Sequence, residues 1–294
     1  MINDPNISEL YAGISGIVLP VDKYEFGYGI VLSETYAHVM APYLVAFSPA
    51  EPGKPHPAPW KPVKGDLSFD VYAQLYIPKD LRIERWFDRI NTIWWFLALI
   101  RLNGYTFARV PVVGILPFSE IPNSINEPIF WPVEMNSERL NPSESAIIQL
   151  DLSVLEWVNK YWLTAGMLMR DYESFSIAFQ AVDQCIWNNS PALALVNVWG
   201  GLEKIFSPSN QELRFRISTA IAAYLEPPGE NRLNLFYTIR KLYDARSRAA
   251  HGTASDEKKA FTDTYNLLRR VLIKIIEENK VPQKEEIEKL IFGV

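Results

Sequence analysis

Two residues near the end of a predicted helix could carry out acid–base chemistry on a phosphate ester. Arg246 and His251 lie five positions apart in the segment KLYDARSRAAHG. An imidazole can take a proton from a ribose 2′-hydroxyl or give one to the leaving 5′-oxygen. A guanidinium can hold the phosphate through two hydrogen bonds while negative charge develops on it. This pair of residue types predicts cleavage of RNA without a metal ion.

The spacing of this pair limits how a single chain can use it. Five residues at about 100° each place Arg246 and His251 roughly 140° apart around an ideal helix. The chain has two other histidines, His38 and His56, and both are interpreted as structural. Because acid and base assistance together are easier with two imidazoles, we expect a homodimer that brings two such helix ends together.

The helix that carries Arg246 also has a cationic surface. Arg240, Lys241 and Arg248 accompany Arg246, with Asp244 to offset them, in a chain whose net charge is −5. We predict that these cations bind the phosphates of RNA. The alternative is a solvated helix face in which Asp244 pairs with Arg240 or with Lys241.

Three segments in this part of the chain resemble the HEPN superfamily, in particular its ApeA-like branch. Residues 246–251 fit the R-x4-H motif, and the earlier segments VNVWGGLEKIF and ELRFRISTAIAAYL resemble two preceding helices of that branch, in the same order. The resemblance covers about a third of the chain, from Ser174 to Asn279. It implies a helical bundle, a homodimer formed through the motif helices, and metal-independent endoribonuclease activity used in prokaryotic antiviral defence or toxin systems.

The resemblance also assigns roles to single residues. It maps Arg246 and His251 onto the catalytic arginine and histidine, and Glu203 onto a polar residue of an earlier helix. Ser247 stands directly after the arginine, where many active members have Asn, Asp or His. Since some HEPN domains are not catalytic, the alternative is a dimerisation module that binds a nucleotide, RNA or a protein without cleaving it.

Two supporting positions have both a functional and a purely structural interpretation. Glu203 either orients Arg246 or is an exposed carboxylate next to Lys204. Arg216, in the following helix, either extends the RNA-binding surface or pairs with Glu212; Arg214 has the same two interpretations but is not included in the predicted site.

These residues belong to the second of two predicted domains. The polar, turn-rich stretch from Met135 to Ala146 separates a β-type pattern from a helical one. We therefore predict an α+β domain over residues 1–140, which senses a protein or ligand trigger or positions the substrate, and an all-α, HEPN-like helical bundle over residues 141–294. Helices are expected at about residues 151–168, 172–188, 191–206, 210–225, 231–250, 256–279 and 283–291.

The first predicted domain combines short strands with one helix. The apolar stripe of residues 83–103 predicts a helix that is buried nearly all round. Prolines between residues 49 and 65 predict an extended loop, with a PxxP ligand as the alternative. Strands are expected at residues 15–20, 29–32 and 67–77, followed by further β-type segments at 105–118 and 125–135.

Composition excludes several classes of protein. The chain has 48% hydrophobic and 21% charged residues over 294 positions, which is typical of a globular protein. A single cysteine, Cys185, rules out an internal disulfide and is expected to be buried. The start MINDPNISEL does not read as a secretory signal, and the apolar run Ile93–Ile100 is too short to span a membrane. We expect a cytoplasmic protein without a cofactor or a metal.

Overall fold

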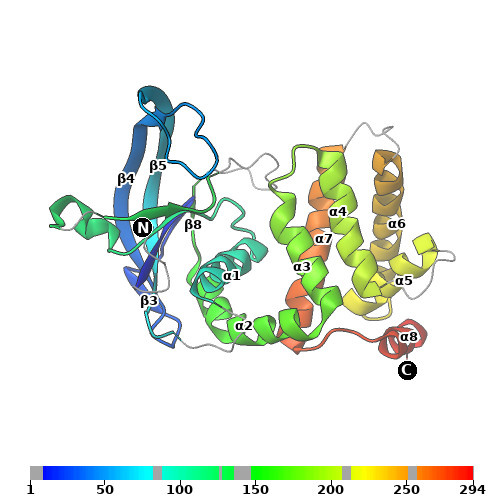
Figure 1. Ribbon diagram of the computed structural model, residues 1–294. Coiled ribbons are helices and arrows are strands. Elements are labelled where there is room, and N and C mark those ends of the chain that lie inside the picture. Colours follow the sequence, from blue (N-terminus) through cyan, green and yellow to red (C-terminus); the bar gives the residue numbers. More distant parts are fainter. Residues whose placement is uncertain are drawn as a thin grey trace. The chain divides into compact units, whose positions relative to one another are not determined.

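The structure, a computed structural model, consists of two compact units. It describes residues 9–81, 88–125, 128–135, 147–206, 213–250 and 257–293. The first, here called the sheet unit, comprises Met1–Leu81 and Arg109–Met135. The second, the helical unit, comprises Arg82–Ala108 and Asn136–Val294. The predicted order of an α+β region followed by an all-helical part is confirmed (Figure 1).

The sheet unit is built on an antiparallel sheet with the strand order β3-β4-β5-β1-β6-β7. Its inner face packs around Val71, Val112 and Phe118. The short strand β2 lies outside this sheet, and the two-residue strand β8 belongs to the helical unit. The strand bounds are β1 Leu10–Ser15, β2 Ile17–Val18, β3 Lys23–Glu25, β4 Val31–Ala46, β5 Lys61–Ile77, β6 Arg109–Gly114, β7 Phe130–Pro132 and β8 Ile148–Gln149, and a 3-10 helix covers Phe118–Asn123.

The hairpin of β4 and β5 is much longer than the sequence predicts. The two strands pair from Val31 opposite Tyr76 out to Ala46 opposite Lys61 (Figure 1). The predicted strands at 29–32 and 67–77 are therefore too short, and the proline-rich loop covers residues 47–60 instead of 49–65. Pro62 is tolerated opposite Val45 because β1 pairs only with residues 73–77 of β5, so that β5 is an edge strand at this end.

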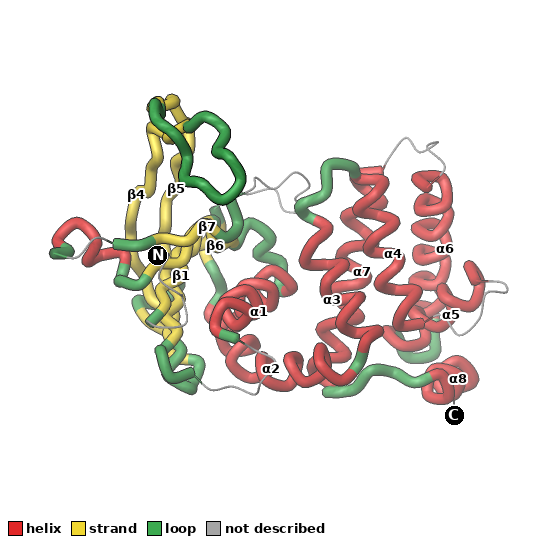
Figure 2. Tube along the Cα trace, in the orientation of Figure 1, coloured by secondary structure: helices red, strands yellow, loops and turns green. Residues whose placement is uncertain are grey.

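The helical unit contains the seven helices expected in the second half of the chain. Figure 2 draws these helices in red. No helix in the described part of the chain is long and apolar enough to cross a membrane. The helix bounds are α2 Leu152–Asp171, α3 Glu173–Cys185, α4 Pro191–Phe206, α5 Leu213–Leu225, α6 Glu230–Ala250, α7 Glu257–Glu278 and α8 Lys284–Phe292.

Helix α1 (Arg89–Leu102) is grouped with the helical unit, although its residues lie within the range predicted for the first domain. Asp88 caps it by accepting a hydrogen bond from the backbone N–H of Asn91 at 2.7 Å. Its side chains are buried nearly all round, as predicted, with Trp95 fully covered. Because α2 and α3 pack against it, this apolar helix forms part of the core of the helical unit.

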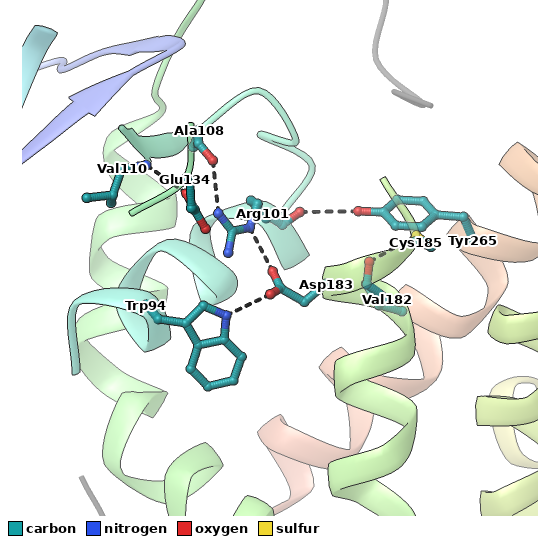
Figure 3. A network of polar contacts seen from close by, with 9 residues as sticks. All are labelled: Trp94, Arg101, Ala108, Val110, Glu134, Val182, Asp183, Cys185 and Tyr265. Atoms are coloured by element: carbon teal, nitrogen blue, oxygen red, sulfur yellow. Dashed lines mark hydrogen bonds and ion pairs between the residues drawn. The ribbon is translucent and has the colours of Figure 1, made fainter. Parts of the chain in front are cut away.

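A buried ion pair joins α1 to α3. The Arg101 Nε atom donates to Asp183 Oδ1 at 2.7 Å, and the Trp94 indole N–H donates to Asp183 Oδ2 at 2.8 Å (Figure 3). Arg101 Nη1 also donates to the Ala108 carbonyl at 3.1 Å. Exposed fractions of 2% for Arg101 and 5% for Asp183 show that both charges are sealed from water. The carboxylate and the guanidinium thus exchange their hydration for hydrogen bonds from several sides.

Cys185 follows this ion pair at the end of α3. It is fully buried, as predicted, and its thiol donates a hydrogen bond to the Val182 carbonyl at 3.0 Å. Burial raises the pKa of the thiol well above its ordinary value. The side chain therefore packs as a small apolar group.

Candidate functional site

Arg246 and Glu203 form an ion pair between α6 and α4. The distance from Arg246 Nη2 to Glu203 Oε1 is 3.3 Å, and the same nitrogen donates to Oε2 at 3.5 Å. The two side chains are 26% and 21% exposed, so the pair is partly open to solvent. The structure therefore brings together two of the residues singled out from the sequence, in the contact expected if Glu203 orients Arg246.

Packing of α4 fixes the position of the Glu203 carboxylate. Trp199 and Leu202 are fully buried and place this side of α4 in the core of the bundle. Gly201 faces α3 and α7 so closely that a β-carbon there would lie 3.1 Å from Ala178 Cα and 2.9 Å from a methyl of Leu268. Glu203 is two residues further along the helix, at the edge of this buried face. The close packing of α4 thus holds Glu203 where α6 can meet it.

The ring of Tyr243, on the same helix as Arg246, supports the guanidinium and is itself packed on Trp199 of α4. The guanidinium carbon of Arg246 lies 5.7 Å from the centre of the Tyr243 ring, and Tyr243 packs edge-to-face on Trp199 at 5.2 Å. Burial, followed by the charge of Glu203, raises the pKa of Tyr243, while Arg246 opposes this shift. Tyr243 therefore stays uncharged near neutral pH. Arg246 is held by a carboxylate and by an uncharged aromatic face.

The described residues end just before the predicted catalytic histidine. Helix α6 continues through Ala250, and His251 lies outside the described residues. Ser247, next to Arg246, is half-buried on α6. The Nε atom of Arg246 is buried and has no hydrogen-bond partner within the described ranges. The assignment of His251 as an acid–base residue stays a prediction.

A cationic pocket lies further towards the start of α6. It is open, has a volume of about 610 Å³, and is lined by Asn234, Tyr237, Thr238, Arg240 and Lys241 of α6 together with Arg214 of α5. The guanidinium of Arg240 lies 5.5 Å from the centre of the Phe236 ring. Lys241 is exposed. Two of the predicted RNA-binding residues, Arg240 and Lys241, therefore share one surface.

Asp244 forms its ion pair across the helix interface. It accepts a hydrogen bond from Arg214 Nη2 of α5, whereas the sequence interpretation places its partner on α6, at Arg240 or Lys241. Because α5 packs directly on α6, an arginine from the neighbouring helix can reach this carboxylate. Asp244 thus reduces the charge of a residue that the sequence interpretation did not include in the site.

Arg216 and Arg248 lie apart from that pocket. Arg216 is exposed and lines a different pocket, together with Lys204 of α4. Arg248 is exposed near the end of α6. Residues two positions apart are related by a rotation of about 200° around the helix axis. Only one of Arg214 and Arg216 can therefore face α6. The sequence spacing therefore predicts that the two arginines lie on different faces of α5. Which of them faces α6 depends on how α5 packs against α6, and this cannot be read from the spacing.

The described side chains include no group of three or more histidine, cysteine or acidic residues that could hold a metal ion. The polar groups of the site are instead an arginine, a carboxylate and a tyrosine from two helices of one unit. Comparisons of the chain with protein-family models, with curated proteins and with solved structures found no match.

Proposed function

We propose that this protein is a metal-independent endoribonuclease that acts as a homodimer, with Arg246 and His251 as its catalytic residues. The observation that supports this best is the setting of Arg246, a partly exposed guanidinium held by Glu203 and by the Tyr243 ring. His251 follows it by five residues. Use in prokaryotic antiviral defence or in a toxin system is part of the proposal and rests on the HEPN resemblance.

The proposed reaction uses the substrate's own hydroxyl as the nucleophile. An imidazole of His251 takes the proton from the ribose 2′-hydroxyl, and the 2′-oxygen forms a bond to phosphorus. The bond between phosphorus and the 5′-oxygen breaks, and the leaving oxygen takes a proton from an imidazolium. In the homodimer this second group is the partner subunit's His251. The products are a 2′,3′-cyclic phosphate and a free 5′-hydroxyl.

Arg246 would bind the phosphate oxygens that gain charge in this step. A guanidinium has five N–H donors, and both contacts to Glu203 are made by Nη2, so donors remain for a phosphate. Glu203 acts as a positioning residue because it touches Arg246 and not the reacting atoms. Holding the arginine in place before the substrate binds reduces the reorganisation required in the transition state.

The test is an RNA cleavage assay with the full chain in EDTA, using tRNA and total RNA. We expect cleavage by the wild type and by two matched controls, Arg170→Ala on α2 and His56→Ala in the proline-rich loop. Arg246→Ala and His251→Ala should each lower the cleavage rate by at least about 10²-fold while their unfolding midpoints and oligomeric state stay unchanged. A 2′-deoxy nucleotide at the cleaved position should block the reaction.

Three results would contradict the nuclease proposal. These are cleavage that requires a divalent metal, products without a cyclic phosphate, and activity that survives both Arg246→Ala and His251→Ala. Absence of cleavage by the wild type on every RNA tested would favour the second candidate function.

That second candidate is an RNA-binding module without nuclease activity. It is favoured by the open pocket on α6, where Arg240 and Lys241 lie beside the exposed Tyr237, because bases stack on aromatic rings while cations bind phosphates. In this case His251→Ala should leave RNA affinity unchanged. Arg240→Ala and Lys241→Ala should each weaken binding and lower the salt slope of log K by about one.

A further inference from the structure

A second pocket lies between α4, α5 and α8, and of the predicted site residues only Arg216 is among its described lining. Its volume is about 490 Å³, within the range of pockets that bind small molecules. Its walls are mainly apolar. They include Phe206 from the end of α4, Phe215 and Ala220 of α5, Val281 from the segment before α8, and Ile287 and Ile291 of α8.

Cations gather among these apolar walls. Among the described residues, Lys204, Arg216 and Lys284 line the pocket, and Glu288 is the acidic residue of this lining. The distance from Lys284 Nζ to Glu288 Oε1 is 3.9 Å, which is longer than a hydrogen bond. The described lining therefore has more cationic than acidic side chains, although the whole chain has a net charge of −5.

Helix α8 forms a fixed wall of this pocket. Arg232 of α6 donates from Nη1 to the Leu290 carbonyl at 2.9 Å and from Nε to the Glu226 carbonyl at 2.8 Å, so one side chain ties α8 to the end of α5. A capping box formed by Gln283 and Glu286 starts α8, with the Gln283 backbone N–H donating to Glu286 at 3.2 Å. The pocket is thus formed before any ligand binds.

The combination of walls and charges selects one chemical class of ligand. Apolar walls with phenylalanine rings favour an aliphatic or aromatic body, which gains free energy by leaving water. Arg216, Lys204 and Lys284 favour a carboxylate, sulfonate or phosphate on the same molecule. We propose that this pocket binds a small amphipathic anion. The proposal does not depend on nuclease activity, because neither Arg246 nor Glu203 lines the pocket.

The test compares two fluorescent probes that share one ring system and differ in charge. 1-Anilinonaphthalene-8-sulfonate is anionic, and N-phenyl-1-naphthylamine is neutral. Titrated into the full wild-type chain, the anionic probe should bind about tenfold tighter or more, as expected for one charge-assisted hydrogen bond. Arg216→Gln combined with Lys204→Gln should remove this preference and leave the affinity for the neutral probe within about twofold.

Two variants that fill the pocket test its location. Ala220→Trp on α5 and Ile291→Trp on α8 should each abolish binding of both probes. If Ala220→Trp does not fold, Ile291→Trp still tests the location, because it leaves the sequence of α5 unchanged. Phe47→Ala is the matched control, because Phe47 is exposed on the hairpin of the sheet unit and could bind the same dyes. It should leave the titration unchanged.

Competition identifies the body of the ligand. Displacement of the anionic probe by dodecanoate, but not by dodecanol, supports an acyl anion. Displacement by naphthalene sulfonate alone supports an aromatic anion. The proposal is overturned if dodecanol competes as well as dodecanoate, if both probes bind equally, or if the titration responds to Phe47→Ala and not to the pocket-filling variants.

Discussion

Two arginine–carboxylate pairs in the helical unit have the same chemistry and opposite surroundings. Arg101 and Asp183 are sealed, 2.7 Å apart, with further hydrogen bonds to the Trp94 indole and the Ala108 carbonyl. Arg246 and Glu203 are partly exposed, with a closest distance of 3.3 Å. A pair that is sealed from solvent and held by hydrogen bonds within the protein is closed to a ligand. A pair that is open and looser can receive one.

A further pair, Arg214 with Asp244, is more exposed than either of these. Its side chains are 44% and 37% exposed. Removing one partner of a buried pair leaves an uncompensated charge in a medium of low polarity, whereas water replaces the lost partner at the surface. Breaking one of these three pairs should therefore lower the free energy of unfolding most for the most buried pair. The loss of RNA cleavage should not follow this order, because it should be largest at the pair of Arg246 and Glu203.

The largest expected effect is that of Asp183→Ala. Loss of this carboxylate leaves Arg101 buried without its counter-charge and should lower the free energy of unfolding by about 3–5 kcal/mol. Denaturant unfolding, followed by tryptophan fluorescence, measures it. Glu203→Ala is the matched control at the open pair, with an expected loss of about 1 kcal/mol or less.

Replacing both members of the sealed pair separates charge from packing. Arg101→Met combined with Asp183→Leu leaves no unpaired charge, and it should recover most of the stability lost in Asp183→Ala. Equal losses in Asp183→Ala and Glu203→Ala would contradict the contrast between a sealed and an open pair.

Arg246→Ala is expected to lower activity strongly and stability little, in contrast to Asp183→Ala. If the proposed function is correct, the rate of RNA cleavage in EDTA should fall by about 10²–10³-fold, the usual loss when a donor to a developing oxyanion is removed. The free energy of unfolding should change by about 1 kcal/mol or less. Arg246→Lys should restore the charge but little of the rate, because an ammonium cannot bind two phosphate oxygens in the same planar geometry. A loss of rate that follows a loss of folded protein would refute this assignment.

Cys185 offers a direct measure of how firmly the sealed pair is held. Its thiol is fully buried, and burial raises its pKa, so the native protein should react slowly with an aromatic disulfide reagent even in mildly alkaline buffer. Asp183→Ala should speed this labelling about tenfold for every 1.4 kcal/mol by which the local opening becomes easier. Glu203→Ala should leave the labelling rate unchanged. Fast labelling of the wild type would show that α3 opens without global unfolding.

The sequence pattern predicts the helices better than it predicts which side chains contact each other in the fold. The 3.6-residue periodicity places α2 to α8 within a few residues of their observed bounds, and the nearly uniform apolar character of α1 predicts its burial. The ion pair that anchors α1 joins residues 82 positions apart. No local pattern connects them, because their contact depends on how α1 and α3 dock.

The same limit applies to the sheet and to the candidate site. The sequence pattern does not predict the outer part of β5, because Pro62 interrupts the alternation of apolar and polar residues. The structure tolerates Pro62 because β5 is an edge strand there. Arg246 was selected from its spacing to His251, and Glu203 from a resemblance, and the structure brings Arg246 and Glu203 into contact. The choice between Arg214 and Arg216 needed the packing of α5 on α6 and α8.

The two arginines of α5 provide the smallest and most discriminating test. Arg214 is already paired with Asp244, so Arg214→Ala should change the free energy of unfolding by only about 0.2–1 kcal/mol. It should lower the salt slope of RNA binding by less than one, because Asp244 neutralises part of its charge. Arg216→Ala should leave RNA binding unchanged while it weakens binding of the anionic probe to the pocket beside α8. If Arg216→Ala weakened RNA binding as much as Arg240→Ala, the RNA-binding surface would have to extend around α5, and the pocket beside α8 would be part of it.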